Sequence, residues 1–168
     1  IWAEELSPSS SHGVTTAVMG NCGVGFAPCR REDHAMLIDV MEGVEDIPGV
    51  VMTEGLPWDW ETFPEYLETV AAGRRDIDVA AYLPHSPLRV YAMGERGAAR
   101  EVATEDDLAL MRRLTAEAMR AGALGFATSR LSIHKTADGE AIPTFDTDIA
   151  ELEAITRGMA DVGAGTFQ

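Results

Sequence analysis

Short apolar runs alternate with longer amphipathic stretches along most of this chain. Four runs have the apolar, often β-branched composition of buried strands: residues 14–19, 78–83 and 124–128, and the closing A-G-T-F-Q. Between them, apolar side chains recur at the three- and four-residue spacing of a helix face. This spacing predicts helices over residues 31–41, from Thr62, from Thr104, and over about 147–162.

The order of these elements predicts a parallel α/β fold. Strand, helix and strand follow one another, with no hairpin turn such as Asn-Gly between the strands. Such alternation is typical of parallel strands joined by crossover helices. Four strands fit half of a (β/α)8 barrel or a small doubly wound sheet. Because the chain starts and stops in mid-pattern, we expect part of a (β/α)8 TIM-type barrel.

Several residues mark the expected ends of these elements. Thr104 and Asp107 have capping-box spacing, and Gly122 stands where a left-handed C-terminal cap is expected. Residues 42–61 read as a long connection, and S-P-S-S-S-H-G at residues 7–13 reads as a turn. The last helix is expected to pack through Ile149, Leu152, Ile155, Met159 and Val162.

The charge balance argues against two classes of partner. The chain carries 28 acidic and 13 basic residues, a formal net charge of -15. This field repels phosphate backbones and anionic membranes, so neither nucleic acid nor a membrane is expected to bind. No apolar run approaches the roughly 20 residues that span a bilayer.

Cysteine usage bears on the compartment. The two cysteines, Cys22 and Cys29, are too few and too close in sequence for a disulfide framework. The opening I-W-A-E-E-L lacks the basic start of a signal peptide. We therefore expect a cytoplasmic protein.

Candidate reactive residues follow three of the predicted strands. Cys22 follows the first, His85 the second, and Ser129 with Arg130 the third. In parallel α/β folds, reactive groups gather at the carboxyl ends of the strands. A thiolate among glycines, as in G-N-C-G-V-G, is either a zinc ligand or a nucleophile. The alternative is a small buried side chain, which is the commoner role of cysteine.

The other candidates also have two interpretations. His85 and Arg89 are expected to face one pocket, unless the histidine only caps the strand end. Ser129 and Arg130 can bind a carboxylate, because a guanidinium matches that group with two parallel hydrogen bonds. The alternative for Arg130 is a solvated side chain.

The remaining motifs are expected to be structural. The aromatic segment L-P-W-D-W-E fits a hydrophobic clamp over the long connection better than a pocket lining. His12 and His34 are expected at the surface, and Cys29 as a structural thiol. G-N-C-G-V-G matches neither the dinucleotide fingerprint nor a Walker loop.

Read together, several strings resemble one known family. They are G-V-T-T-A-V-M-G-N-C-G-V-G-F-A-P, M-E-G-V-E-D-I-P, L-P-W-D-W-E-T-F-P-E-Y-L, D-V-A-A-Y-L-P-H-S-P-L-R, M-G-E-R-G-A-A-R and A-G-A-L-G-F-A-T-S-R. With them the chain resembles, from Ser7 onward, the N-acyl-D-amino-acid deacylase (D-aminoacylase) branch of the amidohydrolase superfamily.

The resemblance implies a (β/α)8 barrel with a small β-domain and catalytic zinc. The family's metal site combines an H-x-H pair, a cysteine after the second strand, two later histidines and a late aspartate. Of these, the resemblance places only the cysteine in this chain, at Cys22. The implied reaction is zinc-dependent hydrolysis of an N-acyl-D-amino acid to a carboxylate and a free D-amino acid, with the aspartate moving the proton.

The same resemblance shapes the expected domain organisation. Residues 1–168 are expected to be the central part of one catalytic barrel, without its N- and C-terminal portions. The chain has no H-x-H pair and only four histidines. Because catalytic zinc needs about three protein ligands, we expect this chain alone to be inactive.

One departure from the family leaves the substrate open. Deacylases commonly continue the third-strand motif with Gly, Leu and a substrate-contacting Tyr, whereas S-R-L-S-I-H stands here, with Arg130 and Ser132 in those places. The expected small-molecule partner is an N-acyl amino acid. The alternatives are a cyclic-amide hydrolase of the same superfamily, and a non-catalytic truncated homologue that self-associates through exposed strand edges.

Overall fold

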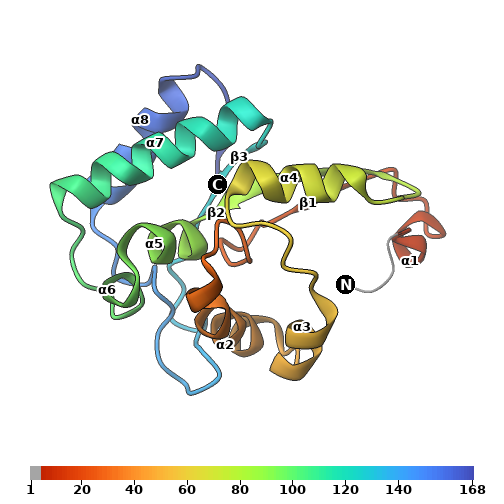
Figure 1. The fold of residues 1–168 in the computed structure, drawn as a ribbon, viewed down its shortest axis with the longest axis horizontal. Coiled ribbons are helices and arrows are strands. Elements are labelled where there is room, and N and C mark those ends of the chain that lie inside the picture. The colour runs from red at the N-terminus through yellow and green to blue at the C-terminus, as the bar shows by residue number, and fades with distance from the viewer. Residues whose placement is uncertain (1–4) are drawn as a thin grey trace.

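The structure is a computed structural model that describes residues 5–168, so most of the opening I-W-A-E-E-L lies outside the described residues. It confirms a parallel α/β fold (Figure 1). The sheet has the order β1-β2-β3-β4, and each neighbouring pair is parallel. The strands are β1 (Thr16–Met19), β2 (Asp78–Pro84), β3 (Gly125–Ala127) and β4 (Thr166–Phe167).

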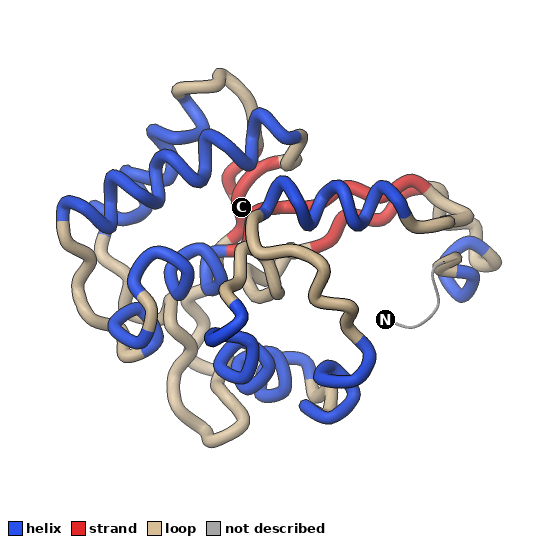
Figure 2. The backbone as a smooth tube through the Cα atoms, viewed as in Figure 1, coloured by secondary structure: helices blue, strands red, loops and turns tan. Residues whose placement is uncertain are grey.

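One short helix precedes β1, and helices lie in each connection between the strands. They are α1 (Ser7–Ser10), the 3-10 turn η1 (Arg31–Asp33), α2 (His34–Glu45), α3 (Gly49–Gly55), α4 (Phe63–Ala72), α5 (His85–Met93), α6 (Glu95–Ala98), α7 (Glu105–Ala121) and α8 (Ile149–Ala160). In Figures 1 and 2, α4 lies alongside β1 and β2, whereas α2 and α3 lie apart from the strands. Met41 of α2 and Leu56, directly after α3, line one cavity with Met19 and Pro84, the last residues of β1 and β2, so α2 and α3 lie near the carboxyl ends of the strands.

One core joins the sheet to a single helical layer. Phe63 of α4, Met111 of α7 and Ile155 of α8 pack into the same buried cluster as Leu83 of β2 and Phe126 of β3. A doubly wound sheet would divide its helices between two faces and reverse its strand order. Sequential strands with α4, α7 and α8 in one core are instead the arrangement of a (β/α)8 barrel segment.

The helix ends follow their sequence signals. Thr104 Oγ1 accepts from the backbone N–H of Asp107, whose carboxylate accepts from the N–H of Thr104, so the expected capping box is formed. Gly122 ends the same helix with φ of 108°. Thr62 and Glu65 form a second capping box at α4.

Other local expectations were wrong. The turn at residues 7–13 contains the short helix α1, and the long connection contains α3. Helix α5 was not predicted, and its Pro87 is tolerated because it lies in the first turn, where backbone N–H groups have no intrahelical partner to lose. Ile149 is 62% exposed because it begins α8, whereas Ile155 on the same expected face is fully buried.

The two outer strands leave apolar surface uncovered. Val18 of β1 and Phe167 of β4 are each 45% exposed. Both strands are edges of the four-stranded sheet, and open edges favour pairing with other chains. Among residues 5–168, no helix is long and apolar enough to cross a membrane.

These edges lead us to expect that a polypeptide of these 168 residues alone self-associates. Sedimentation velocity over a range of micromolar concentrations should show a dimer or larger species. A monomer that persists throughout that range would contradict the expectation.

The capping box of α7 gives a second prediction. Thr104→Ala removes the hydroxyl acceptor and should lower the free energy of unfolding by about 1 kcal/mol, measured by urea denaturation. Thr156→Ala is the matched control, because Thr156 is exposed within α8 and its hydroxyl bonds only the Leu152 carbonyl. The control should change the unfolding free energy by less than about 0.5 kcal/mol. Equal effects of the two substitutions would refute a capping role.

Candidate functional site

The loop after β1 packs tightly against the ends of β2 and β3. Gly20 and Gly23 have φ of 83° and 73°, backbone that favours glycine. A Cβ on Gly20 would lie 2.8 Å from the Tyr82 carbonyl oxygen, and one on Gly23 would lie 2.8 Å from Thr128 Cα. Glycines on both sides of Cys22 therefore allow its loop to touch the neighbouring strand ends.

Cys22 is half-buried between the strand ends and α2. Its Sγ donates a hydrogen bond to Glu45 Oε1 at 3.3 Å, and its side chain packs on a cluster that contains Val24 and Ile142. Burial raises the pKa of the Cys22 thiol, and the Glu45 carboxylate raises it further. Without a bound cation the thiol is therefore protonated at neutral pH.

The residues around Cys22 do not complete a metal site by themselves. Across residues 5–168, no group of three or more His, Cys, Asp or Glu side chains is arranged to hold a metal ion. Cys22 and Glu45 offer one thiol and one carboxylate, whereas catalytic zinc needs about three protein ligands. This part of the chain can supply a ligand to such a site but cannot form one alone.

A buried charged cluster lies behind the carboxyl edge of the sheet. His85 Nε2 lies 2.8 Å from Glu151 Oε1, and His85 Nδ1 lies 2.7 Å from Thr128 Oγ1. Arg89 Nη1 donates to Glu151 Oε2. His85, Arg89 and Glu151 are each at least 98% buried. Two side chains of α5 thus meet on one carboxylate of α8, and Thr128 after β3 joins the cluster through the imidazole.

The cluster holds Glu151 ionised and His85 neutral. Burial acts to raise the pKa of Glu151, but hydrogen bonds from His85 and Arg89 outweigh it and keep that pKa below its usual value. Burial lowers the pKa of His85, and Glu151 opposes this only in part. A neutral imidazole that donates from Nε2 to the carboxylate must accept at Nδ1, so the Thr128 hydroxyl donates.

Arg89 has further fixed partners. Its Nε donates to the Gly97 carbonyl at 3.1 Å, and Nη2 donates to the Glu101 carbonyl. His85 and Arg89 therefore converge on Glu151 inside the protein. That they face a substrate pocket stays a prediction.

Ser129 and Arg130 lie at the edge itself. Ser129 is buried, with its Oγ 2.8 Å from His134 Nδ1 and its carbonyl accepting from Thr144 Oγ1 at 2.7 Å. Arg130 is exposed. The segment after β3 thus has a fixed backbone and a guanidinium free to reach solvent.

Sequence reasoning missed Glu151, although its spacing carried a signal. Glu151 is four residues before Ile155 and eight before Met159, which are both buried on α8. A carboxylate on the core face of a helix requires a buried partner. The spacing does not say which donors meet the carboxylate, and the structure supplies them from His85 and Arg89.

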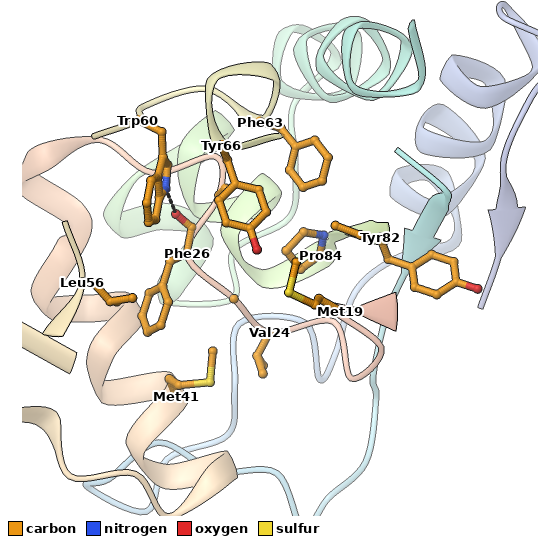
Figure 3. A pocket seen from close by; sticks show the side chains of 14 residues that line it. Met19, Val24, Phe26, Met41, Leu56, Trp60, Phe63, Tyr66, Tyr82 and Pro84 are labelled. Carbon is orange, nitrogen blue, oxygen red and sulfur yellow. Dashed lines mark hydrogen bonds between the residues drawn. The ribbon is translucent and has the colours of Figure 1, made fainter. Parts of the chain in front are cut away.

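The aromatic segment both clamps the chain and lines a cavity. Trp60 Nε1 donates to the Phe26 carbonyl at 2.7 Å. Beside it lies an apolar cavity of about 200 Å³. Figure 3 shows the side chains of Met19, Val24 and Tyr66 reaching it from different elements. Because small-molecule sites usually measure about 300–1,000 Å³, we regard this cavity as a packing feature.

The remaining histidines and Cys29 behave largely as expected. His12 is exposed. His34 is only partly exposed, because its ring stacks on Trp58 with 3.7 Å between ring centroids. Cys29 is 2% exposed, and burial raises the pKa of its thiol to about 12, which fits a structural role.

Comparison with known proteins identifies the family. The model of the amidohydrolase family matches residues 1–167. The chain belongs to this family. The D-aminoacylase of Alcaligenes xylosoxydans xylosoxydans is 32% identical to this amidohydrolase chain over 124 residues, which are 74% of this chain and 23% of that protein. The resemblance to D-aminoacylases is thus confirmed.

Solved amidohydrolases share the fold. The crystal structure of D-aminoacylase matches with a TM-score of 0.67 and 27% identity, over 98% of this chain and 30% of that one. The N-acyl-D-glutamate deacylase of Bordetella bronchiseptica, solved with zinc and a phosphonate mimic of the tetrahedral intermediate, matches with a TM-score of 0.62 and 27% identity, over 91% and 27%. This amidohydrolase chain spans less than a third of the length of these relatives.

The charged cluster gives a testable prediction about stability. Glu151→Gln leaves the Arg89 guanidinium buried without an anion, and should lower the free energy of unfolding by about 3 kcal/mol at pH 7. Because the folded pKa of Glu151 lies below its unfolded value, the carboxylate stabilises above about pH 4.5, and this contribution is lost as pH falls through the folded pKa. Urea denaturation from pH 7 to pH 3 measures both effects.

Glu153→Gln on the same helix is the matched control. Glu153 pairs with Arg157 at 3.3 Å, but both side chains are more than half exposed. Its loss should change the unfolding free energy by less than about 0.5 kcal/mol. A Glu151→Gln variant as stable as this control would show that the buried cluster is not stabilising.

Proposed function

We propose that this chain is the central part of the catalytic barrel of a zinc-dependent amidohydrolase that splits N-acyl-D-amino acids. The products are the carboxylate of the acyl group and a free D-amino acid. Family membership supports the hydrolase class, and the D-aminoacylase relatives support the substrate class. The neighbour solved with zinc and a tetrahedral-intermediate mimic supports the metal.

The position of Cys22 is the observation that carries this proposal. It lies directly past β1, at the strand end where reactive groups of such barrels gather. Its loop is pressed against the ends of β2 and β3. As a thiolate, Cys22 would supply one ligand to zinc, and the other ligands would come from the rest of the barrel. Zinc there would lower the pKa of a bound water to about 7 and polarise the amide carbonyl.

This chain's own residues would bind and orient the substrate. Arg130 is exposed beside the buried Ser129, so its guanidinium can donate two parallel hydrogen bonds to a substrate carboxylate. His85 and Arg89 would serve substrate binding indirectly, through the residues that they hold in place, because both are at least 98% buried. A cytoplasmic location is also part of the proposal. Arg130 and Ser132 in place of the family's usual residues leave the preferred side chain and acyl group open.

The two cysteines allow a matched test in the intact protein. Cys22→Ala should reduce zinc content and lower kcat/KM for N-acyl-D-amino acids by on the order of a hundredfold or more, because one protein ligand of the metal is lost. Cys29→Ala removes a buried thiol whose Sγ donates only to the neighbouring Arg30 carbonyl, and should keep both zinc and activity. Metal analysis and steady-state kinetics provide the readouts.

Two results would decide against the proposal. Wild-type zinc content and activity in Cys22→Ala would remove Cys22 from the metal site. Hydrolysis of cyclic imides with no hydrolysis of linear N-acyl-D-amino acids would place the protein with the cyclic-amide hydrolases instead.

A further inference from the structure

The segment after β3 is held by partners from distant parts of the chain. The Thr128 backbone N–H donates to the Gln168 carbonyl at 2.9 Å, in line with the strand ladder. The Thr128 hydroxyl meets His85 Nδ1 at 2.7 Å, and the next carbonyl, of Ser129, accepts from Thr144. Thr128 is therefore fixed on its backbone side by the sheet and on its side-chain side by the imidazole.

The buried Glu151 carboxylate determines which partner donates in the hydrogen bond between Thr128 and His85. Glu151 is ionised, so it accepts from His85 Nε2 and leaves Nδ1 as an acceptor. Arg89 occupies the other oxygen of Glu151, and the carbonyls of Gly97 and Glu101 fix Arg89 in turn. A continuous series of hydrogen bonds thus runs from the α6 region through α8 to the end of β3.

The series ends beside the proposed reaction site. Thr128 directly precedes Ser129 and Arg130, and the Cys22 loop lies against the same segment, because a Cβ on Gly23 would come within 3.0 Å of Ser129 N. The Gly23 carbonyl also accepts from the Ser86 N–H at 2.9 Å, one residue past His85. A shift of Thr128 would consequently disturb both the arginine and the loop that carries the thiol.

Stability alone does not account for this arrangement. A buried Arg–Glu pair is no more stabilising than well-packed apolar residues of similar volume, and an imidazole adds a further polar group to bury. A neutral histidine that donates to a carboxylate can only accept at its other nitrogen, so the hydroxyl beyond it must point its proton at the ring.

We propose that Glu151 and His85 are positioning residues, which hold Thr128 so that the Thr128–Arg130 segment is set for substrate binding. The inference deepens the proposed amide hydrolysis and rests on it for the identity of the substrate. Neither residue needs to touch the reacting atoms.

Thr128→Val and Thr128→Ser in the intact protein test the inference. Valine keeps the shape of threonine but removes the hydroxyl, whereas serine keeps the hydroxyl. Thr128→Val should raise KM for an N-acyl-D-amino acid about tenfold, with kcat within about threefold of wild type. This change in KM corresponds to the loss of one oriented hydrogen bond. Amide hydrogen exchange over residues 128–133 should become about tenfold faster, and Thr128→Ser should restore both quantities.

Each other outcome also decides the question. Unchanged KM and exchange in Thr128→Val would overturn the inference, as would a Thr128→Ser variant as impaired as Thr128→Val. Glu151→Gln, if it folds, should accelerate amide hydrogen exchange over the same residues. Exchange as slow as in the wild type would show that Glu151 does not position this segment. If the wild-type protein hydrolyses no N-acyl-D-amino acid, the proposed function fails, and exchange alone then shows whether the series of hydrogen bonds holds the segment.

Discussion

The Glu151 carboxylate is the point on which distant parts of this structure converge. It accepts from His85 and Arg89 of α5, while it belongs to α8 itself. α8 packs on α7, where Gly158 lies close to the Arg112 carbonyl, and a buried carboxylate on α8 would destabilise this packing unless α5 presented both donors. Docking of α8 covers Phe126 of β3 and completes the shared core. One charged contact thus sets the register between the second and third crossover connections.

Close backbone approach is the second constraint. Gly20 and Gly23 let the loop after β1 rest on the ends of β2 and β3, where any side chain would collide with backbone atoms. Parallel strands already bring their carboxyl ends to one edge, and this loop brings Cys22 there at close range. The geometry of the edge therefore depends on the absence of side chains as much as on their chemistry.

These two constraints explain how the four parallel strands carry an ordered carboxyl edge. The chain belongs to the amidohydrolase family, shares the fold of D-aminoacylase, and spans less than a third of the length of these relatives. Within residues 5–168 no complete set of metal ligands surrounds Cys22, whereas the hydrogen bonds that join Glu151, His85 and Thr128 behind the edge are all formed. Buried residues that do not touch a ligand can hold in position the residues that do, which is a general way to preorganise a binding site.

The sequence by itself determined the local features of this protein. Apolar periodicity located all four strands, and Thr104 with Gly122 marked the ends of α7, because these signals act over a few residues. The G-N-C-G-V-G string indicated a close-packed loop around a thiol at a strand end. Only the tertiary structure decided that Glu151 pairs with His85, 66 residues away, and that the Thr128 hydroxyl donates the last hydrogen bond of the series. Local pattern carries no information on which distant side chains meet, since that depends on how the crossover helices dock on the sheet.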